Sequence, residues 1–267
     1  MRPASAHDGN EVVNVYWGWT IDTVSTGSPE RLGAGGRVVG AGPLPELAMV
    51  ALLDGPNAVE TEIGMVTSIP AGTRLLGVEV SGDVAAVDLS DDFNEGGGTL
   101  GETMRFAQIV FTLTQFDDVD AVSFRIDGVD VDTVGTHGFD VAAPIDRNTF
   151  DELGVRPFIL LEHPYPGGEF ASGDRIVGDS NTFEATVEYA VVDGDGRILG
   201  EGFTTASAGS GTWGRFDATV EFDAGAGGRG GIVVFESSPE DGSPTNVVEY
   251  PLDLLAGSPV DELPPTR

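Results

Sequence analysis

The sequence predicts two domains of different class: an α+β or α/β layer domain at residues 10–154 and an all-β sandwich at residues 157–256. Two observations carry this prediction. Between Ile69 and Gly128 the hydrophobic period switches from strand to helix and back to strand. After Pro157 no helical pattern occurs, and short alternating runs are separated by turns rich in glycine. Interleaved strands and helices indicate a layered α/β unit, and a series of short strands indicates a sandwich.

In the first domain, we expect the segment at 21–42, which is rich in glycine, serine and threonine, to be a loop. The helix around Pro45 has prolines in its first turn and a Gly-Pro pair beyond its end. Asp146 is a candidate cap for the last helix. The predicted strands are Val12–Trp17, Leu75–Val80, Val84–Leu89 and Val119–Ile126, and the predicted helices are Leu44–Leu53, Glu102–Phe116 and Ile145–Leu153.

The helix predicted at Glu102–Phe116 is apolar around most of its circumference. Its polar residues form one narrow stripe, which we expect to be its only exposed edge. The stripe consists of Arg105, Gln108, Thr112 and Gln115.

In the second domain, alternating residues and intervening turns predict roughly seven strands. An Asp-Gly-Asp-Gly turn beginning at Asp193 joins two of them into a hairpin. The alternating runs are Arg175–Gly178, Phe183–Val192, Arg197–Thr204, Gly214–Phe222, Ile232–Glu236 and Val247–Leu254.

The composition limits what the chain binds. The 267 residues carry a formal net charge of −31, with no lysine and no cysteine. The absence of cysteine excludes disulfides and thiolate chemistry within this sequence. Nucleic acid and anionic membrane surfaces are not expected partners, because their recognition needs clustered positive charge. No apolar stretch approaches the ~20 residues that span a bilayer, and the first residues do not resemble a signal peptide. The chain is then either cytoplasmic or lacks its leader.

No residue pattern points to catalysis, a cofactor or a metal, so we assign no catalytic, cofactor-binding or metal-binding residues. The glycines Gly96, Gly98 and Gly101 precede a helix, but surrounding carboxylates would repel a phosphate, and a flexible connection is the preferred interpretation. Asp127, Asp130 and Asp132 could reach one weak calcium ion, as some acidic cluster would by chance in so acidic a chain.

The candidate contact residues are aromatic. Tyr16, Trp17 and Trp19 cluster at the end of the first strand. If Trp17 lies in the core, Trp19 is expected to be partly exposed at the rim, where its indole could stack on a sugar or a protein partner. Ordinary core packing is the competing interpretation.

Linked motifs in the first half resemble the GerMN domain of sporulation and spore germination proteins. They are IPAGTRLLGVEV, VAAVDLS, TLTQF and VSFRIDG, in this order between residues 69 and 128. The second half resembles the immunoglobulin-like domain of bacterial spore germination proteins. The matching stretches are His163-Pro164-Tyr165-Pro166, IVGDSNTFEATVEYAVVDGDGRIL and VVFESSPEDGS.

The resemblance implies a non-enzymatic, exported and often lipid-anchored protein of the bacterial cell envelope. An envelope protein or a peptidoglycan component is the implied partner. Three hypotheses remain open: a protein-interaction scaffold, a module that binds cell-wall glycan, and a carboxylate-based hydrolase. A sheet edge with few charges would favour the first, and a wet pocket beside Trp19 the second. Close carboxylates in a deep cleft would favour the third.

Overall fold

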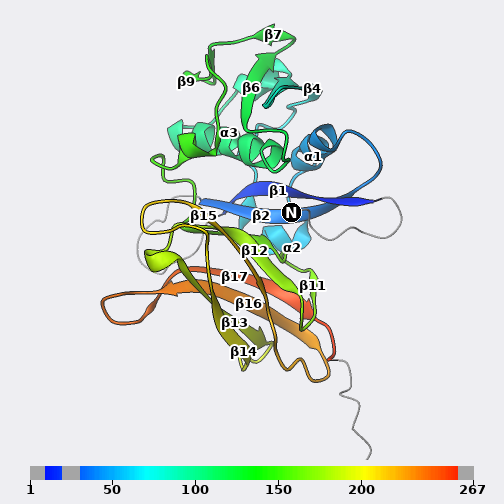
Figure 1. The fold of residues 1–267 in the computed structure, drawn as a ribbon. Helices are drawn as coiled ribbons and strands as arrows, with labels where there is room; N and C mark the ends of the chain where they lie inside the picture. The colour runs from blue at the N-terminus through cyan, green and yellow to red at the C-terminus, as the bar shows by residue number, and fades with distance from the viewer. Residues whose placement is uncertain (1–9, 20–30, 258–267) are drawn as a thin grey trace, which may run out of the picture. The chain divides into compact units, whose positions relative to one another are not determined.

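The computed structural model describes residues 10–19 and 31–257. The chain divides into two compact units, residues 1–162 and residues 163–267 (Figure 1). The first unit is mixed α/β and the second is mainly β, as the sequence predicts. No helix among the described residues combines the length and apolar character needed to cross a membrane.

The first unit contains two main sheets and three α-helices. One sheet has the strand order β2-β1-β3, and the other has the order β4-β5-β6-β7. Strands β5 and β6 are parallel and are connected through α3, while the other pairs in both sheets are antiparallel. The elements are β1 (Glu11–Trp19), β2 (Arg31–Val39), α1 (Leu44–Leu53), α2 (Ala58–Glu62), β3 (Met65–Val66), β4 (Leu75–Ser81), β5 (Val84–Leu89), η1 (Asp91–Asn94), α3 (Thr99–Leu113), β6 (Ala121–Ile126), β7 (Val129–Asp130), β8 (Thr133–Val134), β9 (Phe139–Asp140) and η2 (Arg147–Phe150).

The loop predicted at residues 21–42 is wrong where β2 lies, from Arg31 to Val39. Residues 21–30 of that prediction lie outside the described residues. β2 pairs with β1 along its full length, with Gly35 opposite Val15 and Gly33 opposite Trp17. Because glycine has no side chain, these positions of β2 leave room for bulky neighbouring side chains. A Cβ atom at Gly35 would lie 1.9 Å from Glu60 Oε1 and 3.0 Å from Trp17 Nε1. A glycine-rich sequence that appears unfavourable for a strand is required here by close packing.

α1 has the predicted bounds, Leu44–Leu53, whereas the other two predicted helices differ in their ends or in type. α3 begins at Thr99, one turn before the predicted start. The last predicted helix is a short 3₁₀ helix, η2, and its Asp146 cap is confirmed, since Asp146 Oδ1 accepts from Thr149 N at 3.1 Å. The unpredicted α2 begins with a capping box in which Asn57 and Glu60 satisfy each other's backbone N–H groups.

The second unit is dominated by a five-stranded sheet in the order β11-β17-β16-β13-β14. β12 and β15 pair antiparallel in a second sheet. Every predicted run contains a strand, but β15 ends three residues early and the run predicted from Phe183 begins with a 3₁₀ helix. The elements are β10 (Ile159–His163), which leads the chain into this unit, β11 (Glu169–Phe170), β12 (Arg175–Ser180), η3 (Phe183–Ala185), β13 (Thr186–Asp193), β14 (Ile198–Thr205), β15 (Gly214–Thr219), β16 (Gly228–Ser237) and β17 (Pro244–Leu254).

The faces of the five-stranded sheet follow from the period of two. Val187 and Val191 of β13 are fully buried on the inner face, together with Ile232 and Val234 of β16. The register between β13 and β14 shifts by one residue, because Val191 opposes Gly200 whereas Val192 opposes Ile198. The extra residue, Leu199, forms a β-bulge.

Candidate functional site

The structure buries all three candidate aromatic residues. Tyr16 and Trp17 are 0% exposed and Trp19 is 6% exposed. The expected rim position of Trp19 is therefore wrong. Its indole Nε1 donates to Ile63 O at 2.6 Å, and its backbone pairs with Met65 in β3 and Arg31 in β2. Because β1 is the central strand of its sheet, an aromatic residue at its end is flanked on both sides.

Both faces of β1 are also covered, which the simple alternation of the sequence could not show. On one face, the Tyr16 ring packs edge-on against Phe111 of α3, with centroids 5.6 Å apart. On the other face, Trp17 lies beside Glu60 of α2. The aromatic cluster is thus a core feature, with no ring presented to solvent in the manner that sugar stacking requires.

A buried ion pair lies beside Trp17. Arg37 donates to both carboxylate oxygens of Glu60, with Nη1–Oε1 at 2.7 Å and Nη2–Oε2 at 2.5 Å. Glu60 is 1% exposed, and the Arg37 guanidinium lies 5.5 Å from the Trp17 ring centroid. The bidentate geometry fixes the position of the carboxylate beneath Gly35.

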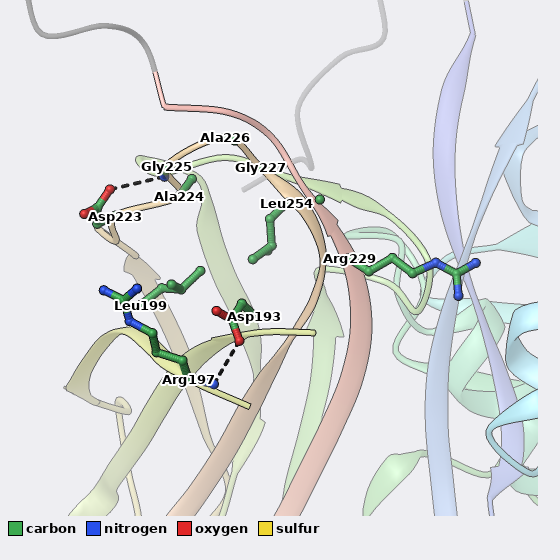
Figure 2. Close-up of a pocket in the computed structure, with 11 residues that line it drawn as sticks. Asp193, Arg197, Leu199, Asp223, Ala224, Gly225, Ala226, Gly227, Arg229 and Leu254 are labelled. Atoms are coloured by element: carbon green, nitrogen blue, oxygen red, sulfur yellow. Dashed lines mark hydrogen bonds between the residues drawn. The ribbon is translucent and has the colours of Figure 1, made fainter. Parts of the chain in front are cut away.

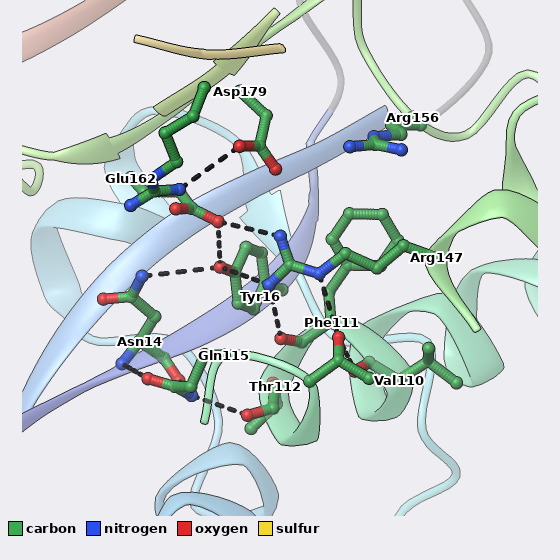
Figure 3. Close-up of polar contacts among 12 residues, drawn as sticks. Asn14, Tyr16, Val110, Phe111, Thr112, Gln115, Arg147, Arg156, Glu162 and Asp179 are labelled. Carbon is green, nitrogen blue, oxygen red and sulfur yellow. Dashed lines mark hydrogen bonds and ion pairs between the residues drawn. The ribbon is translucent and has the colours of Figure 1, made fainter. Parts of the chain in front are cut away.

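A second polar cluster surrounds the Tyr16 hydroxyl (Figure 3). Tyr16 Oη donates to Glu162 Oε1, and Arg147 Nη1 donates to the same oxygen at 3.2 Å. Arg147 Nε also donates to Thr114 Oγ1 at 2.9 Å. Burial, with the neighbouring Glu162 charge, raises the pKa of Tyr16 far above its ordinary value. Tyr16 therefore stays protonated, and this cluster ties β1, α3, η2 and β10 together.

The polar stripe of α3 is also buried, contrary to the exposed edge predicted for it. Arg105, Gln108 and Thr112 are at most 1% exposed. Gln108 Oε1 accepts from Ser68 N at 2.7 Å, and its Nε2 donates to Tyr16 O at 3.0 Å. Arg105, Gln108 and Gln115 of the stripe connect α3 to backbone groups of other segments. The buried Thr112 hydroxyl has no hydrogen-bond partner among the described residues.

At the other end of the stripe, Arg105 makes hydrogen bonds to the loop that precedes α3. Its guanidinium donates to the carbonyls of Phe93 at 2.6 Å, Glu95 at 3.1 Å and Gly96 at 2.6 Å. A Cβ atom at Gly97 would lie 2.4 Å from Arg105 Nη2. In the connection that contains Gly96, backbone carbonyl oxygens therefore point toward the buried cation of Arg105. A phosphate-binding loop instead points its backbone N–H groups toward an anion.

Glu102, in the first turn of α3, holds the turn between β8 and β9. Its Oε1 accepts from Thr136 N at 2.8 Å and from Thr136 Oγ1 at 2.7 Å, and His137 N lies 3.2 Å from both carboxylate oxygens. Burial alone would raise the pKa of Glu102, but these hydrogen bonds outweigh it and hold the pKa below the ordinary 4.5.

Two further features lie within the described ranges, the suggested calcium turn and a cavity in the second unit. No group of three or more potential ligands converges there, and Asp130 of the suggested calcium turn instead pairs with Arg125 at 2.8 Å. A shallow cavity of ≈ 260 Å³ lies at one end of the second unit (Figure 2). Its carboxylates are engaged locally: Asp193 Oδ1 accepts from Arg197 N at 2.9 Å and Asp223 Oδ1 accepts from Gly225 N at 3.2 Å.

The feature with the form of a binding site is an exposed apolar face at one end of the five-stranded sheet. β14 is its last strand, and Phe203 on this strand is 71% exposed, the highest value among the large apolar side chains of the described ranges. Ile198, on the same strand, is 55% exposed. Phe203 opposes Glu188 of β13, which in turn opposes Phe235 of β16. We call Ile198, Glu201, Phe203, Glu188 and Phe235 the β14 edge face.

The segment that follows β14 lies along the outer side of this strand. Ala206 N donates to Ala185 O, next to β13, at 2.8 Å, whereas Leu199 O faces the other way and accepts from Asp223 N at 3.1 Å. Beyond the other end of β14, Ser207 N donates to Arg215 O of β15 at 2.9 Å. Hydrogen bonds to the segment that contains β15 therefore close both ends of this side of β14, and the exposed feature is the side-chain face of the strand. The sequence predicts this hairpin, but it carries no signal that β14 is the outermost strand.

Comparison with known proteins agrees with the motifs. Residues 20–132 match the family model described as sporulation and spore germination, and residues 158–243 match the immunoglobulin-like domain of bacterial spore germination. A search of curated proteins found no significant match.

Three solved structures are similar at low identity. A candidate lipoprotein from Clostridium perfringens is 21% identical, over 55% of this chain and 93% of its own, with a TM-score of 0.37. The first GerMN domain of the sporulation protein GerM from Bacillus subtilis is 22% identical, over 42% of this chain and 87% of its own, with a TM-score of 0.35. The tandem GerMN domains of the same protein are 14% identical, over 79% of this chain and 61% of their own, with a TM-score of 0.42.

Proposed function

We propose that this chain, which carries a GerMN domain of sporulation and spore germination followed by the immunoglobulin-like domain of bacterial spore germination, is a non-catalytic interaction module of the bacterial cell envelope. In this proposal the second unit is an immunoglobulin-like sandwich that docks an envelope protein, and the chain acts outside the cytoplasm as an exported, lipid-anchored protein. Both matched families concern sporulation and germination, which supports the envelope as the location.

The β14 edge face is the observation that carries the proposal. Phe203 and Ile198 present exposed apolar side chains on β14, and the strand has a single charged residue, Glu201. Exposed apolar side chains that cluster on the surface of a folded protein commonly mark an interaction site. A face of this form is suited to a protein partner.

The competing glycan hypothesis depended on an exposed Trp19. With this indole buried and bonded to Ile63 O, that hypothesis has lost the residue on which it was built. The protein-docking hypothesis is instead supported by the exposed apolar side chains of β14.

Site-specific photo-crosslinking tests the proposal. The full chain carries a photoreactive amino acid at Phe203, or at Val129 in the first unit as a control, because Val129 is also apolar and is 63% exposed. Each protein is irradiated with envelope fractions of the source bacterium. We expect one discrete adduct from position 203 alone, competed by unlabelled protein but not by the Phe203→Ser variant. Equal adducts from both positions, or none from position 203, would refute the proposal. Recovery of the chain with cytoplasmic markers on fractionation would refute the location.

A further inference from the structure

We propose that the outer face of the five-stranded sheet receives one amphipathic helix of a partner protein, whose apolar stripe is flanked on both sides by arginine or lysine. The inference rests on the proposed docking function and specifies the form and chemistry of the partner. The helix packs on side chains and adds no strand, because hydrogen bonds to the segment that contains β15 close both ends of the outer side of β14.

The outer face consists of the side chains that alternate with the buried ones. Strands β14, β13, β16 and β17 are adjacent in the sheet (Figure 1), and their register arranges these side chains in three rows. The first row is Phe203, Glu188 and Phe235; the second is Glu201, Ala190, Val233 and Glu249; the third is Ile198, Val192, Gly231 and Pro251. We call the residues of these rows the outer sheet face.

The middle of the outer sheet face is apolar. Ala190 and Val192 of β13 lie next to Val233 of β16, and all three are half-buried. Beside them on β14, Phe203 is 71% exposed and Ile198 is 55% exposed. Apolar side chains that are contiguous across neighbouring strands and open to solvent mark a surface that a partner covers.

Glutamates at both sides set the width of this apolar strip. Glu201 on β14 and Glu249 on β17 stand at the two ends of one row, and both are exposed. Three strand spacings separate them, which is about 14 Å. An α-helix with its side chains is about 10–12 Å across, so a single helix fits between the two glutamates. A second sheet several strands wide would instead cover both carboxylates.

The length of the strip also suits a helix. From Glu188 to Val192 the strip runs about 13 Å along β13, which corresponds to about two and a half helical turns. A helix of this length presents one apolar stripe with polar residues on either flank.

Charge selects a cationic partner. The acidic residues of the outer sheet face are Glu188, Glu201 and Glu249, and none of its residues is basic. Arg229, the next residue on this side of β16, opposes Asp253 of β17. Basic residues on the two flanks of the helix would lie opposite Glu201 and Glu249, within a chain of net charge −31. A second copy of this chain would bring glutamates against glutamates, which disfavours a face-to-face dimer.

The test uses the full chain and a synthetic helical peptide with a leucine stripe flanked by arginines. Binding is followed by fluorescence anisotropy at about 0.15 M salt, which screens the general attraction of an acidic chain. Glu249→Arg is compared with Glu240→Arg, because Glu240 is exposed in the turn between β16 and β17 and both variants change the net charge equally. A second peptide has two central prolines, which break the helix. A third has glutamate in place of arginine.

We expect E201R and E249R each to weaken binding of the arginine peptide about fivefold or more, and E240R to leave it within about twofold. We expect neither the proline peptide nor the glutamate peptide to bind. If E249R does not fold, Glu249→Gln and Glu240→Gln provide the same comparison, with about a two- to fivefold difference.

Three results would overturn the inference. Equal weakening by E249R and E240R would show that binding follows overall charge. Weakening by E201R but not by E249R would confine the contact to β14 and exclude a helix between the two glutamates. Binding of the proline peptide with the affinity of the helical one would refute the helix.

Two further outcomes separate this inference from the proposed function. If the arginine peptide does not bind while crosslinking from position 203 yields its discrete adduct, the cationic helix is refuted and the docking function stands. Concentration-dependent dimers in sedimentation that Phe203→Ser abolishes would identify a second copy as the occupant and would also refute the inference.

Discussion

Replacing Gly35 by alanine places a methyl carbon 1.9 Å from Glu60 Oε1, 2.9 Å from Glu60 Cδ and 3.0 Å from Trp17 Nε1. These atoms cannot move away at low cost, because Glu60 is 1% exposed and both of its oxygens are bonded to Arg37. The variant must either distort the pairing of β2 with β1 or displace Glu60 from Arg37.

The expected cost follows from these two routes. Overpacking a rigid core costs about 1–3 kcal/mol, and breaking a buried ion pair costs about 3–5 kcal/mol. We therefore expect Gly35→Ala to lower the free energy of unfolding by about 3 kcal/mol. For a protein of this size, that corresponds to a fall in Tm of roughly 6–12 °C.

Denaturant unfolding followed by tryptophan fluorescence measures this effect, because Trp17 is adjacent to the substitution. Gly40→Ala is the control, since a Cβ atom at Gly40 meets nothing within 4 Å. In a Glu60→Ala background the two closest atoms, Glu60 Oε1 and Cδ, are absent, so Gly35→Ala should cost much less there than in the wild type. A loss below about 0.5 kcal/mol in the wild-type background, or the same loss in both backgrounds, would show that the close approach does not govern β2.

Three further substitutions test other contacts. Glu102→Gln should destabilise the protein at pH 7, and its difference from the wild type should shrink as the pH falls below 4.5. Stability from a depressed carboxyl pKa is fully present above the pKa of the unfolded chain and is lost as the pH falls through the lower pKa of the folded state. A difference that does not change with pH in urea titrations would contradict this. Arg105→Met leaves the carbonyls of Phe93, Glu95 and Gly96 without their donor. It should lower the free energy of unfolding by about 2–4 kcal/mol. Chemical denaturation measures this loss, with Arg125→Met as the control. Tyr16→Phe removes the hydroxyl that donates to buried Glu162 and should cost about 1–3 kcal/mol; a thermal shift within error of the wild type would show that Arg147 alone satisfies the carboxylate.

The sequence predicts the order of elements well wherever local pattern decides the structure. The strands around Val87 and Phe124 have buried residues at every second position, and they were located correctly. β2 was missed because its glycines respond to Trp17 and Glu60, which are distant in sequence. The polar residues of α3 were expected at the surface because the periodic pattern does not show which backbone groups elsewhere need partners. Gln108 meets such a need at Ser68 N and Tyr16 O.

The candidate site shows the same limit. The alternation of side chains along β1 predicts that Trp17 and Trp19 lie on one face. It does not show that both faces of β1 are covered, or that β3 lies beside Trp19. For the β14 edge face, the hairpin of β13 and β14 was predicted from its turn. Which of the two strands is outermost depends on how β16 and β17 join the sheet, and local sequence does not encode that choice.

The β-bulge at Leu199 has an evolutionary consequence. Because Ile198 already opposes Val192 and Gly200 already opposes Val191, deleting Leu199 would yield a regular ladder with Ile198 and Phe203 on their present side. The hairpin can thus lose one residue without changing the side chains that it presents. Relatives aligned across this segment should tolerate a one-residue gap at position 199, whereas a gap between Glu201 and Phe203 would turn the outward residues inward.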